Sequence, residues 1–348
     1  METASQILTP QKKKITYPVS ASFYAYLKEI DRVQQVPVHY DDLLRYNLST
    51  SLYDKKGKDT LWLSLAYSES EMAELNKELT RIYAMLKAGG DTTVMEHLHV
   101  ERIDFCTFGN SKPFRVKIVN NYNDNYDYYY IKKADASRIY GLEWEHILSP
   151  NRINYFVDKQ TLIEEHIVGI PGDQFIKNNL SDKDLNPTRL AKEFVKFNER
   201  CMVRLLGDMR SYNFVIDVTP DFEDTQYRIR AIDFDQQSYE GRRSLYAPQF
   251  FKENFPFVEL CRTHLNPESI KQYRSEERSL MARRIKTSRY RVRQLLEVML
   301  KDELSMPEKE TLLKEELAKF YENPSFLQCN NMGELMKQSL NLLVDNFI

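Results

Sequence analysis

The chain has 348 residues, of which 42% are hydrophobic and 12% aromatic, enough to fill one or two cores. Its 49 lysines and arginines nearly balance 51 aspartates and glutamates, so a net charge of -2 excludes a surface committed as a whole to nucleic acid, a membrane or a strongly acidic partner. Any electrostatic function must therefore be local.

The four cysteines are widely spaced and form no C-x-x-C pair, which favours reduced thiols over a disulfide framework or a zinc site. The N-terminus lacks the apolar stretch of a signal peptide, and no window approaches the roughly 20 apolar residues of a membrane span. We therefore expect a soluble, cytoplasmic protein with no membrane partner. The ten glycines form neither a G-x-x-x-x-G-K-[ST] nor a G-x-G-x-x-G motif, so a phosphate loop built on repeated glycines is excluded.

The first 60 or so residues alternate short apolar runs with polar breaks and predict an irregular, partly helical lead-in. A helix follows, because Ser68 and Glu71 form a capping-box pattern and apolar residues then recur at helical spacing until Gly89-Gly90. These residues are Met72, Leu75, Leu79, Ile82 and Leu86. We assign residues 1–95 to a partly helical N-terminal extension.

Between residues 97 and 168, short aromatic and β-branched runs predict five strands. The runs are RIDFCTF (102–108), FRVKIV (114–119), DYYYIKK (127–133), RINYFV (152–157) and TLIEEHIV (161–168). A turn-rich segment predicts a hairpin between the first two runs, and residues 136–148 predict one short helix between the third and the fourth. The expected order is therefore strand, strand, strand, helix, strand, strand.

After GIPG at 169–172 the pattern becomes helical. Apolar residues step by four, three, four and four from Leu190 to Leu205, a stripe that predicts a helix packed against the core and starting near Asn186-Pro187. Two further strands, NFVIDV and YRIRAIDF, are expected next, and the chain reads as helical from about residue 241 to its end.

Three polar residues stand where these elements end. Asp208 and Asn213 lie five apart between the long helix and the next strand, and Asp233 ends the strand after that, in Ile232-Asp233-Phe234-Asp235. Two carboxylates and a carboxamide would converge there. Phosphoryl transfer needs such a set, because hard oxygen ligands hold magnesium while another carboxylate orients the attacking hydroxyl.

The D-x-x-x-x-N spacing followed by D-F-x resembles the catalytic loop and metal-binding motif of the protein-kinase-like superfamily. The small residue before Asp208 is closer to the aminoglycoside phosphotransferase and choline kinase branch than to protein kinases proper. The resemblance implies that Asp208 is the catalytic base, that Asn213 is a magnesium ligand and that Asp233 is the principal magnesium ligand. It also implies ATP and Mg²⁺ as cofactors.

The fold that this resemblance implies is α+β, a two-lobed protein-kinase-like fold with an N-terminal helical extension. A five-stranded N-lobe with one helix would span residues 96–168, and a mainly helical C-lobe would span 169–348. The strand and helix order read from the sequence agrees with such an N-lobe.

In this family the third strand carries a phosphate-binding lysine, and the helix carries a glutamate that pairs with it. Lys132 and Lys133 compete for the first role, and only one can point inward because side chains alternate along a strand. Glu143 and Glu145 compete for the second. We favour Lys132, which follows an apolar residue, and Glu143, which shares a helix face with Ile139 and Ile147.

Residues 163–169 resemble the hinge that binds adenine through backbone groups in this family, which implies the carbonyl of Glu165 and the amide of Ile167. A packing role for His166 is favoured over an acid–base role. The phosphate-covering loop would be a hairpin turn with one glycine, Gly109. Three departures weaken the likeness to protein kinases: the loop keeps one glycine, Gly109, instead of three, Leu206 replaces the motif's histidine, and Asp235 replaces the glycine of D-F-G.

We therefore predict an ATP- and Mg-dependent phosphotransferase that moves the γ-phosphoryl group to a hydroxyl of a small-molecule acceptor, because no activation segment of the protein-kinase type is visible. The alternatives are a catalytically inactive, kinase-like scaffold that binds nucleotide, and an atypical protein kinase. The sequence leaves the acceptor and the oligomeric state open.

A basic run between residues 283 and 293 is the remaining feature, within an expected helix. It contains Arg283, Arg284, Lys286, Arg289, Arg291 and Arg293. A solvated face is favoured over binding of RNA or of a phosphate-bearing substrate, and Tyr290 alone makes no stacking platform for bases.

Overall fold

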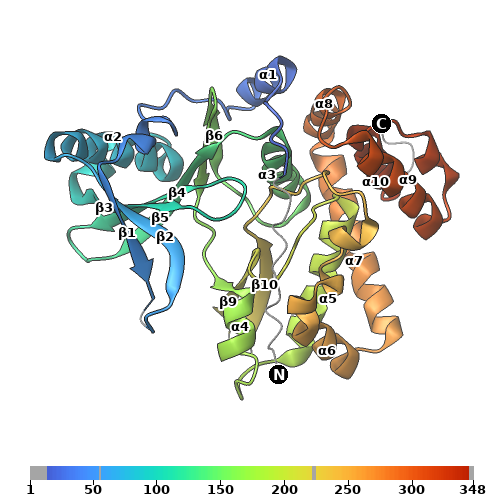
Figure 1. Cartoon of the computed structure of the whole chain (residues 1–348). Coiled ribbons are helices and arrows are strands. Elements are labelled where there is room, and N and C mark those ends of the chain that lie inside the picture. Colours follow the sequence, from blue (N-terminus) through green and yellow to red (C-terminus); the bar gives the residue numbers. More distant parts are fainter. Residues whose placement is uncertain (1–13, 55, 222–224, 345–348) are drawn as a thin grey trace, which may run out of the picture.

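The structure, a computed structural model, describes residues 14–54, 56–221 and 225–344 (Figure 1). In these ranges the strands form a seven-stranded and a three-stranded sheet, and there are ten α-helices. Residues 1–13, on which the expectation of a missing signal peptide rests, lie outside the described residues. No described helix combines the length and the apolar composition that crossing a membrane requires.

The large sheet is antiparallel throughout, with strand order β1-β2-β3-β4-β5-β7-β6. Its strands are β1 (Leu48–Tyr53), β2 (Asp59–Ala66), β3 (Leu98–Cys106), β4 (Phe114–Asn120), β5 (Tyr126–Lys133), β6 (Tyr155–Asp158) and β7 (Thr161–Glu165). Each of the five runs expected from the sequence overlaps one of the strands β3 to β7, but the bounds differ: β3 begins earlier, at Leu98, β6 begins later, at Tyr155, and β7 ends at Glu165.

The expectation of a five-stranded lobe preceded by a helical extension is wrong, because the β1–β2 hairpin adds two strands to the same sheet. Strand β2 pairs with β3, and Trp62 lies opposite Cys106. Nearly every residue of β1 is exposed and half are serine or threonine, so this strand carries no apolar alternation that the sequence could reveal. The first 95 residues thus supply part of the sheet itself.

Helix α2 (Glu69–Ala88) confirms the helix expected from the capping-box pattern. The Ser68 hydroxyl accepts a hydrogen bond from the amide of Glu71, and the Glu71 carboxylate accepts one from the amide of Ser68 at 3.1 Å. Gly89 ends the helix with a φ of +61°, a left-handed conformation that glycine adopts at little cost. The helix buries Leu79 in the core of the sheet lobe.

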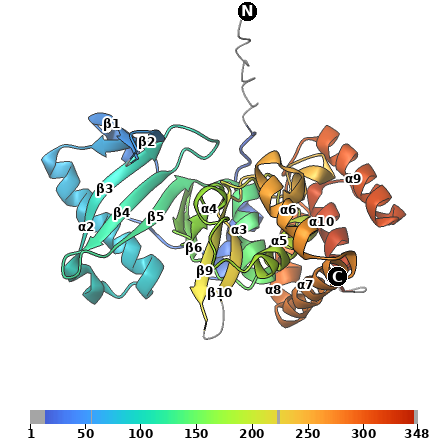
Figure 2. The ribbon, with the colours of Figure 1, turned by 90° about the horizontal axis from the view of Figure 1, so that it is seen from below.

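Helix α3 (Ala136–Leu148) joins β5 to β6 with the bounds expected from the sequence. The side chain of Asp135 caps it by accepting from the amide of Arg138 at 3.2 Å. Of its residues only His146 is not fully buried. Ile139 and its apolar neighbours belong to the core of the helical lobe, so α3 lies where the two lobes meet (Figure 2).

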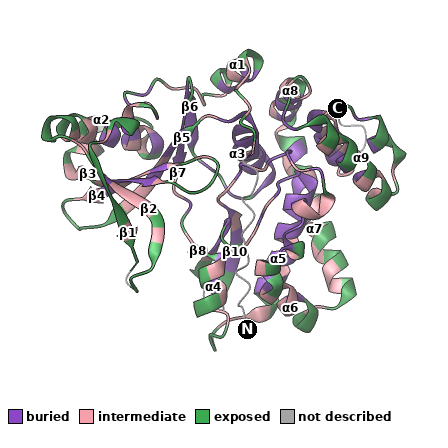
Figure 3. Ribbon diagram, viewed as in Figure 1, coloured by how far each residue is buried: buried purple, intermediate pink, exposed green. Residues whose placement is uncertain are grey.

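The helical lobe contains most of the remaining elements. Its helices are α4 (Gly172–Asn178), α5 (Pro187–Val203), α6 (Phe255–His264), α7 (Pro267–Thr287), α8 (Arg289–Met299), α9 (Pro307–Tyr321) and α10 (Met332–Asn341). The small sheet has the order β10-β9-β8, formed by β8 (Ile170–Pro171), β9 (Phe214–Pro220) and β10 (Thr225–Ala231). Helix α5 is the expected long helix and is capped by Asn186. Figure 3 shows that buried residues concentrate in α3, α5 and the strands between the lobes.

The chain before the sheet packs on the other lobe. Helix α1 (Ala21–Glu29) lies against α8, and Phe23 stacks on Tyr140 of α3 with 3.8 Å between ring centroids. Both rings are fully buried. The N-terminal segment therefore contributes to the cores of both lobes, first through α1 and then through the β1–β2 hairpin and α2.

We expect Phe23→Ala to lower the free energy of unfolding by about 3–5 kcal/mol, because it leaves a cavity against Tyr140. Urea denaturation measures this change. Leu48→Ala, at a side chain that is 71% exposed, is the control and should change the free energy by less than about 0.5 kcal/mol. Equal losses in the two variants would show that α1 is not part of the core.

Candidate active site

A cleft of about 470 Å³ lies between the sheet lobe and the helical lobe. It is lined by the β3–β4 turn, by β5, by the hinge after β7 and by the loops before β9 and after β10. Six of the residues singled out in the sequence line it, namely Gly109, Lys132, Glu165, Ile167, Asn213 and Asp233. Asp208 lies beside Asn213, whereas Glu143 lies elsewhere.

The loop after α5 holds Asp208 in an uncommon conformation. Its φ is +57°, in the left-handed region that non-glycine residues rarely adopt, and Leu205 has a φ of +53°. The Asp208 amide donates to the carbonyl of Leu245 at 3.0 Å, and the Asn213 side-chain amide donates to the Asp208 carbonyl at 2.7 Å. Strained backbone of this kind persists where surrounding contacts fix it, which is typical of functional sites.

The Asp208 carboxylate accepts a hydrogen bond from the guanidinium of Arg210 at 2.8 Å, and Arg210 also pairs with Glu253 at 2.7 Å. Burial raises the pKa of Asp208 above its ordinary value, and Arg210 opposes that rise. The side chain remains 32% exposed, so it can reach a group at the mouth of the cleft. A carboxylate with a raised pKa is a stronger base than an ordinary aspartate.

Asp233 and Asp235 follow β10, and both carboxylates bind the guanidinium of Arg138. Arg138 Nη2 donates to Asp233 at 2.8 Å, and Nε donates to Asp235 at 2.6 Å. A third hydrogen bond, from Nη1 to Glu164 of β7 at 3.1 Å, completes the cluster. A fully buried arginine thus joins helix α3, strand β7 and the loop after β10.

The two carboxylates of this loop have different proton affinities. Burial and the charge of Asp235 raise the pKa of Asp233. Burial alone would also raise the pKa of Asp235, but Arg138, with smaller help from other cations, lowers it to about 2. Asp235 is therefore the permanently charged partner of Arg138, and Asp233 is the carboxylate that a metal ion or a proton can neutralise.

Lys132 points into the cleft, as favoured from the sequence, while Lys133 is 54% exposed and pairs with Asp41 at 3.5 Å. The partner of Lys132 is Glu164 on β7, at 2.7 Å, so the predicted pair with Glu143 is wrong. Burial and the nearby Arg138 lower the pKa of Lys132, and Glu164 opposes this. Lys132 and Arg138 therefore share Glu164.

Glu143 faces away from the cleft. It is fully buried and pairs with Arg291 of α8, at 2.7 Å for Oε2, and with Arg32 at 3.8 Å. Glu145, the alternative, is buried against Arg204. Both glutamates are on α3, but their faces of this helix pack on the helical lobe, where they join α3 to its neighbours.

Two members of the basic run have structural roles. Arg291 pairs with Glu143, and Arg284 donates to the carbonyl of Leu148 at 3.0 Å, so both join the run to α3. These contacts use cationic groups that a nucleic-acid surface would need to present to solvent.

The hinge after β7 forms the other end of the cleft. Glu165 and Ile167 both line it, and their backbone groups stay candidates for binding a base. The His166 side chain lies 3.1 Å from the hydroxyl of Tyr130, and burial lowers the pKa of this histidine. Tyr130 and His166 thus line this end of the cleft together.

The β1–β2 hairpin also contributes to the cleft, which the sequence did not indicate. Trp62 of β2 is part of the lining, and the guanidinium of Arg115 lies over its ring at 4.3 Å. Arg115 is held by Asp104 at 2.7 Å. The turn that carries Gly109, with a φ of +88°, lies beside them and is open enough to approach a ligand.

The metal-binding potential of the site rests on few ligands. Among the described residues, no group of three or more histidine, cysteine, aspartate and glutamate side chains could hold a metal ion. Mg²⁺ needs only one or two protein carboxylates when substrate phosphates and water complete its shell. Asp233, Asn213 and Asp235 fit that requirement, since all three line the cleft.

Comparisons with known proteins identify no family for this chain. No protein-family profile and no curated protein matches the sequence. The chain is similar to a solved structure described as the autoinhibited serine kinase domain of the giant muscle protein titin, with a TM-score of 0.27 and 12% identity over 70% of this chain and 92% of that one. It is also similar to titin kinase with its flanking domains, with a TM-score of 0.26 and 14% identity over 74% of this chain and 53% of the other. At TM-scores this low, neither likeness carries an argument about this chain.

We expect Glu143→Ala to lower the free energy of unfolding by about 3–5 kcal/mol, because it leaves the guanidinium of Arg291 without its buried partner. Urea denaturation measures the change. Glu259→Ala removes an exposed partner of Arg262 and should cost at most about 1 kcal/mol. If Glu143→Ala were as mild as this control, the buried pair would contribute nothing to the packing of α3.

Proposed function

We propose that this chain is an ATP- and Mg-dependent phosphotransferase of the protein-kinase-like superfamily, closer to its aminoglycoside phosphotransferase and choline kinase branch than to protein kinases. The observation that carries the proposal is that Asn213 and Asp233 line one cleft together with Lys132 and Arg138, while Asp208 lies directly beside Asn213. Five residues from four segments of the chain thus offer oxygen ligands and cations to a triphosphate.

Each group has a chemical task in this reaction. Asp208 accepts the proton of the attacking hydroxyl, and its raised pKa suits that task. Asp233 and Asn213 would hold Mg²⁺, which supplies charge neutralisation at the phosphates when bound. Lys132 would neutralise the phosphates from the sheet side. The hinge backbone at Glu165 and Ile167 would bind adenine.

A small-molecule acceptor is supported by the short segment between Asp235 and α6. It consists of three short 3-10 turns between Arg243 and Asn254, and it packs directly on the Asp208 loop through the carbonyl of Leu245. Residues 243–254 are thus folded against the Asp208 loop, which favours a small acceptor over an extended peptide. The acceptor would therefore enter beside Arg210 and Tyr212.

One observation favours a second candidate, a kinase-like scaffold that binds nucleotide without turnover. Arg138 already neutralises Asp233 and Asp235, the carboxylates that would receive a metal ion. In such a scaffold the guanidinium would substitute for Mg²⁺, and nucleotide would bind equally well with and without the metal.

Asp208→Asn should lower Mg-dependent ATP hydrolysis or transfer by about 10² to 10⁴-fold, because it removes the base while it keeps the shape of the side chain. Asp233→Asn should cause a comparable loss by removing a metal ligand. Labelled ATP, tested with a panel of hydroxyl acceptors, measures both. Asp182→Asn, at an exposed position far from the cleft, is the control and should be fully active. Equal activity in the wild type and in all three variants would refute the proposed catalytic roles. Nucleotide binding without any turnover would instead favour the inactive scaffold.

The pH dependence supplies a separate prediction. Because Arg210 holds the pKa of Asp208 down, Arg210→Met should raise that pKa further. The base must be deprotonated, so the acid limb of the kcat/KM profile should move to higher pH in this variant. Arg262→Met, which is 72% exposed and on α6, should leave the profile unchanged. An acid limb that stays in place would mean that Asp208 is not the titrating base.

A further inference from the structure

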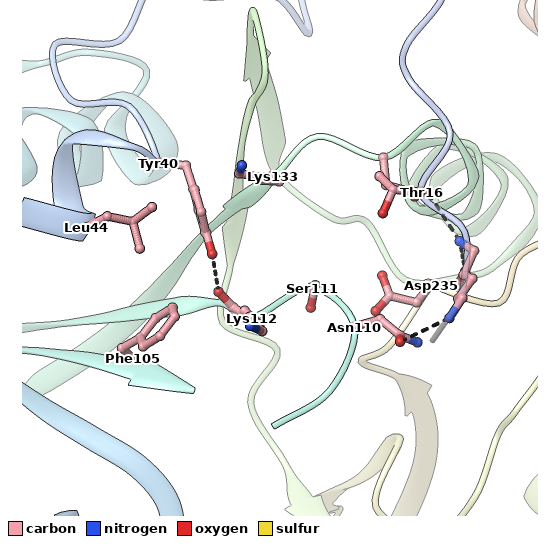
Figure 4. Close-up of a pocket in the computed structure, with 11 residues that line it drawn as sticks. Thr16, Tyr40, Leu44, Phe105, Asn110, Ser111, Lys112, Lys133 and Asp235 are labelled. Atoms are coloured by element: carbon pink, nitrogen blue, oxygen red, sulfur yellow. Dashed lines mark hydrogen bonds and ion pairs between the residues drawn. The ribbon is translucent and has the colours of Figure 1, made fainter. Parts of the chain in front are cut away.

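The residues just before α1 reach the phosphate end of the cleft. Residues 14–17, here called the N-terminal strap, cross between the lobes and make hydrogen bonds to three separate elements. Two of them, Lys14 and Thr16, line a second cavity of about 320 Å³ (Figure 4). This cavity shares Asn110, Ser111 and Asp235 with the cleft. The proposed reaction assigns no role to the N-terminal strap.

Lys14 is the centre of the strap. Its side chain is only 3% exposed, which is rare for a lysine, and its ammonium donates to Asp135 at 3.2 Å and to the backbone carbonyl of Asp235. Its own amide donates to the side chain of Asn110 in the β3–β4 turn at 3.4 Å. One residue thus touches the turn over the phosphates, the cap of α3 and the metal-binding loop.

Two other residues of the strap, Tyr17 and Ile15, make further hydrogen bonds. The Tyr17 amide donates to the second carboxylate oxygen of Asp135 at 3.2 Å, and the Tyr17 carbonyl accepts from the first amide of α3 at 2.9 Å. The Ile15 amide donates to the hydroxyl of Tyr239 at 3.3 Å. The strap is therefore held at Ile15 and Tyr17 as well as at Lys14.

Asp135 makes the connection to the active site. It caps α3 at the amide of Arg138, the residue whose guanidinium binds Asp233 and Asp235. Lys14 thus binds both Asp135, at the start of α3, and the backbone of Asp235. These are the two places that the Arg138 side chain also connects, since Arg138 begins in α3 and its guanidinium binds Asp235. It does not line the cleft itself, so it leaves the nucleotide space free.

The charge balance supports the same role. Four carboxylates meet at this end of the cleft, those of Glu164, Asp233, Asp235 and Asp135, and three cations face them, namely Lys132, Arg138 and Lys14. Without Lys14 the site would carry one more uncompensated negative charge next to the place where a triphosphate would bind. Like charges in a partly buried site repel strongly.

We propose that Lys14 is a positioning residue for the metal- and phosphate-binding groups, and that the N-terminal strap must be in place for Mg·ATP to bind tightly. The inference rests on the proposed function, because it assigns the strap to the same nucleotide site. It also gives part of the N-terminal segment a role that its sequence did not indicate.

The test is a titration of the full chain with mant-ATP, a fluorescent ATP, in the presence of Mg²⁺. Lys14→Met should weaken binding by about tenfold, as expected for the loss of one unit charge near a bound anion. Mant-adenosine, which lacks the phosphates, should bind with unchanged affinity. Lys14→Arg keeps the charge and should stay within about threefold of the wild-type affinity for mant-ATP.

Lys28→Met is the matched control, an exposed lysine on α1, and should behave as wild type with both ligands. Thermal denaturation checks that every variant is folded. If Lys14→Met binds mant-ATP like wild type, loses both ligands equally, or is not rescued by Lys14→Arg, Lys14 has no positioning role. If the wild-type chain itself fails to bind mant-ATP, the proposed function falls and the strap role falls with it.

Discussion

Arg138 projects from the first turn of α3 and donates hydrogen bonds to carboxylates of β7 and of the loop after β10, namely those of Glu164, Asp233 and Asp235. Its side chain is 2% exposed, so the guanidinium is withdrawn from water and depends on these three partners. Removing one partner of a buried charge cluster is costly, because the remaining charges stay buried without compensation. This one cation therefore joins the sheet, the helix and the loop.

The same cluster determines what the cleft can do. In the family that the sequence resembles, a lysine of the third strand pairs with a glutamate of the helix. In this structure the glutamate partner of Lys132 is on β7, and helix α3 supplies Arg138 instead. The helix is thereby coupled directly to the loop that carries Asp233 and Asp235. Any movement of α3 would carry Arg138 away from Asp233 and would change the charge that a metal ion meets. The N-terminal strap acts on the same helix through Asp135.

Much of this could be predicted from local patterns. The bounds of α3, the start of α5 and the proximity of Asp208, Asn213 and Asp233 each follow from short segments whose spacing fixes the structure. The sequence also indicated that Glu143 shares a face with the apolar residues of α3. It could not indicate that this face packs on the helical lobe, because the partner Arg291 comes almost 150 residues later.

The features that the sequence did not predict depend on contacts between distant parts of the chain. Strand β1 is mostly exposed and has no apolar alternation, so its place in the sheet depends on backbone pairing with β2 rather than on an apolar pattern. Arg138 and Lys14 look like ordinary solvated residues in the sequence, and only long-range contacts bury them. Charge clusters between distant segments are set by the tertiary structure, which a single sequence does not display.

The central claim is that the cleft binds a nucleotide through a metal ion held by Asp233 beside Arg138. Isothermal titration calorimetry with ATP, with and without Mg²⁺, tests it most directly. The account predicts that Mg²⁺ strengthens ATP binding by the wild-type chain, and that this gain is lost in Asp233→Ala. ATP binding of equal strength with and without Mg²⁺, or no binding at all, would contradict it.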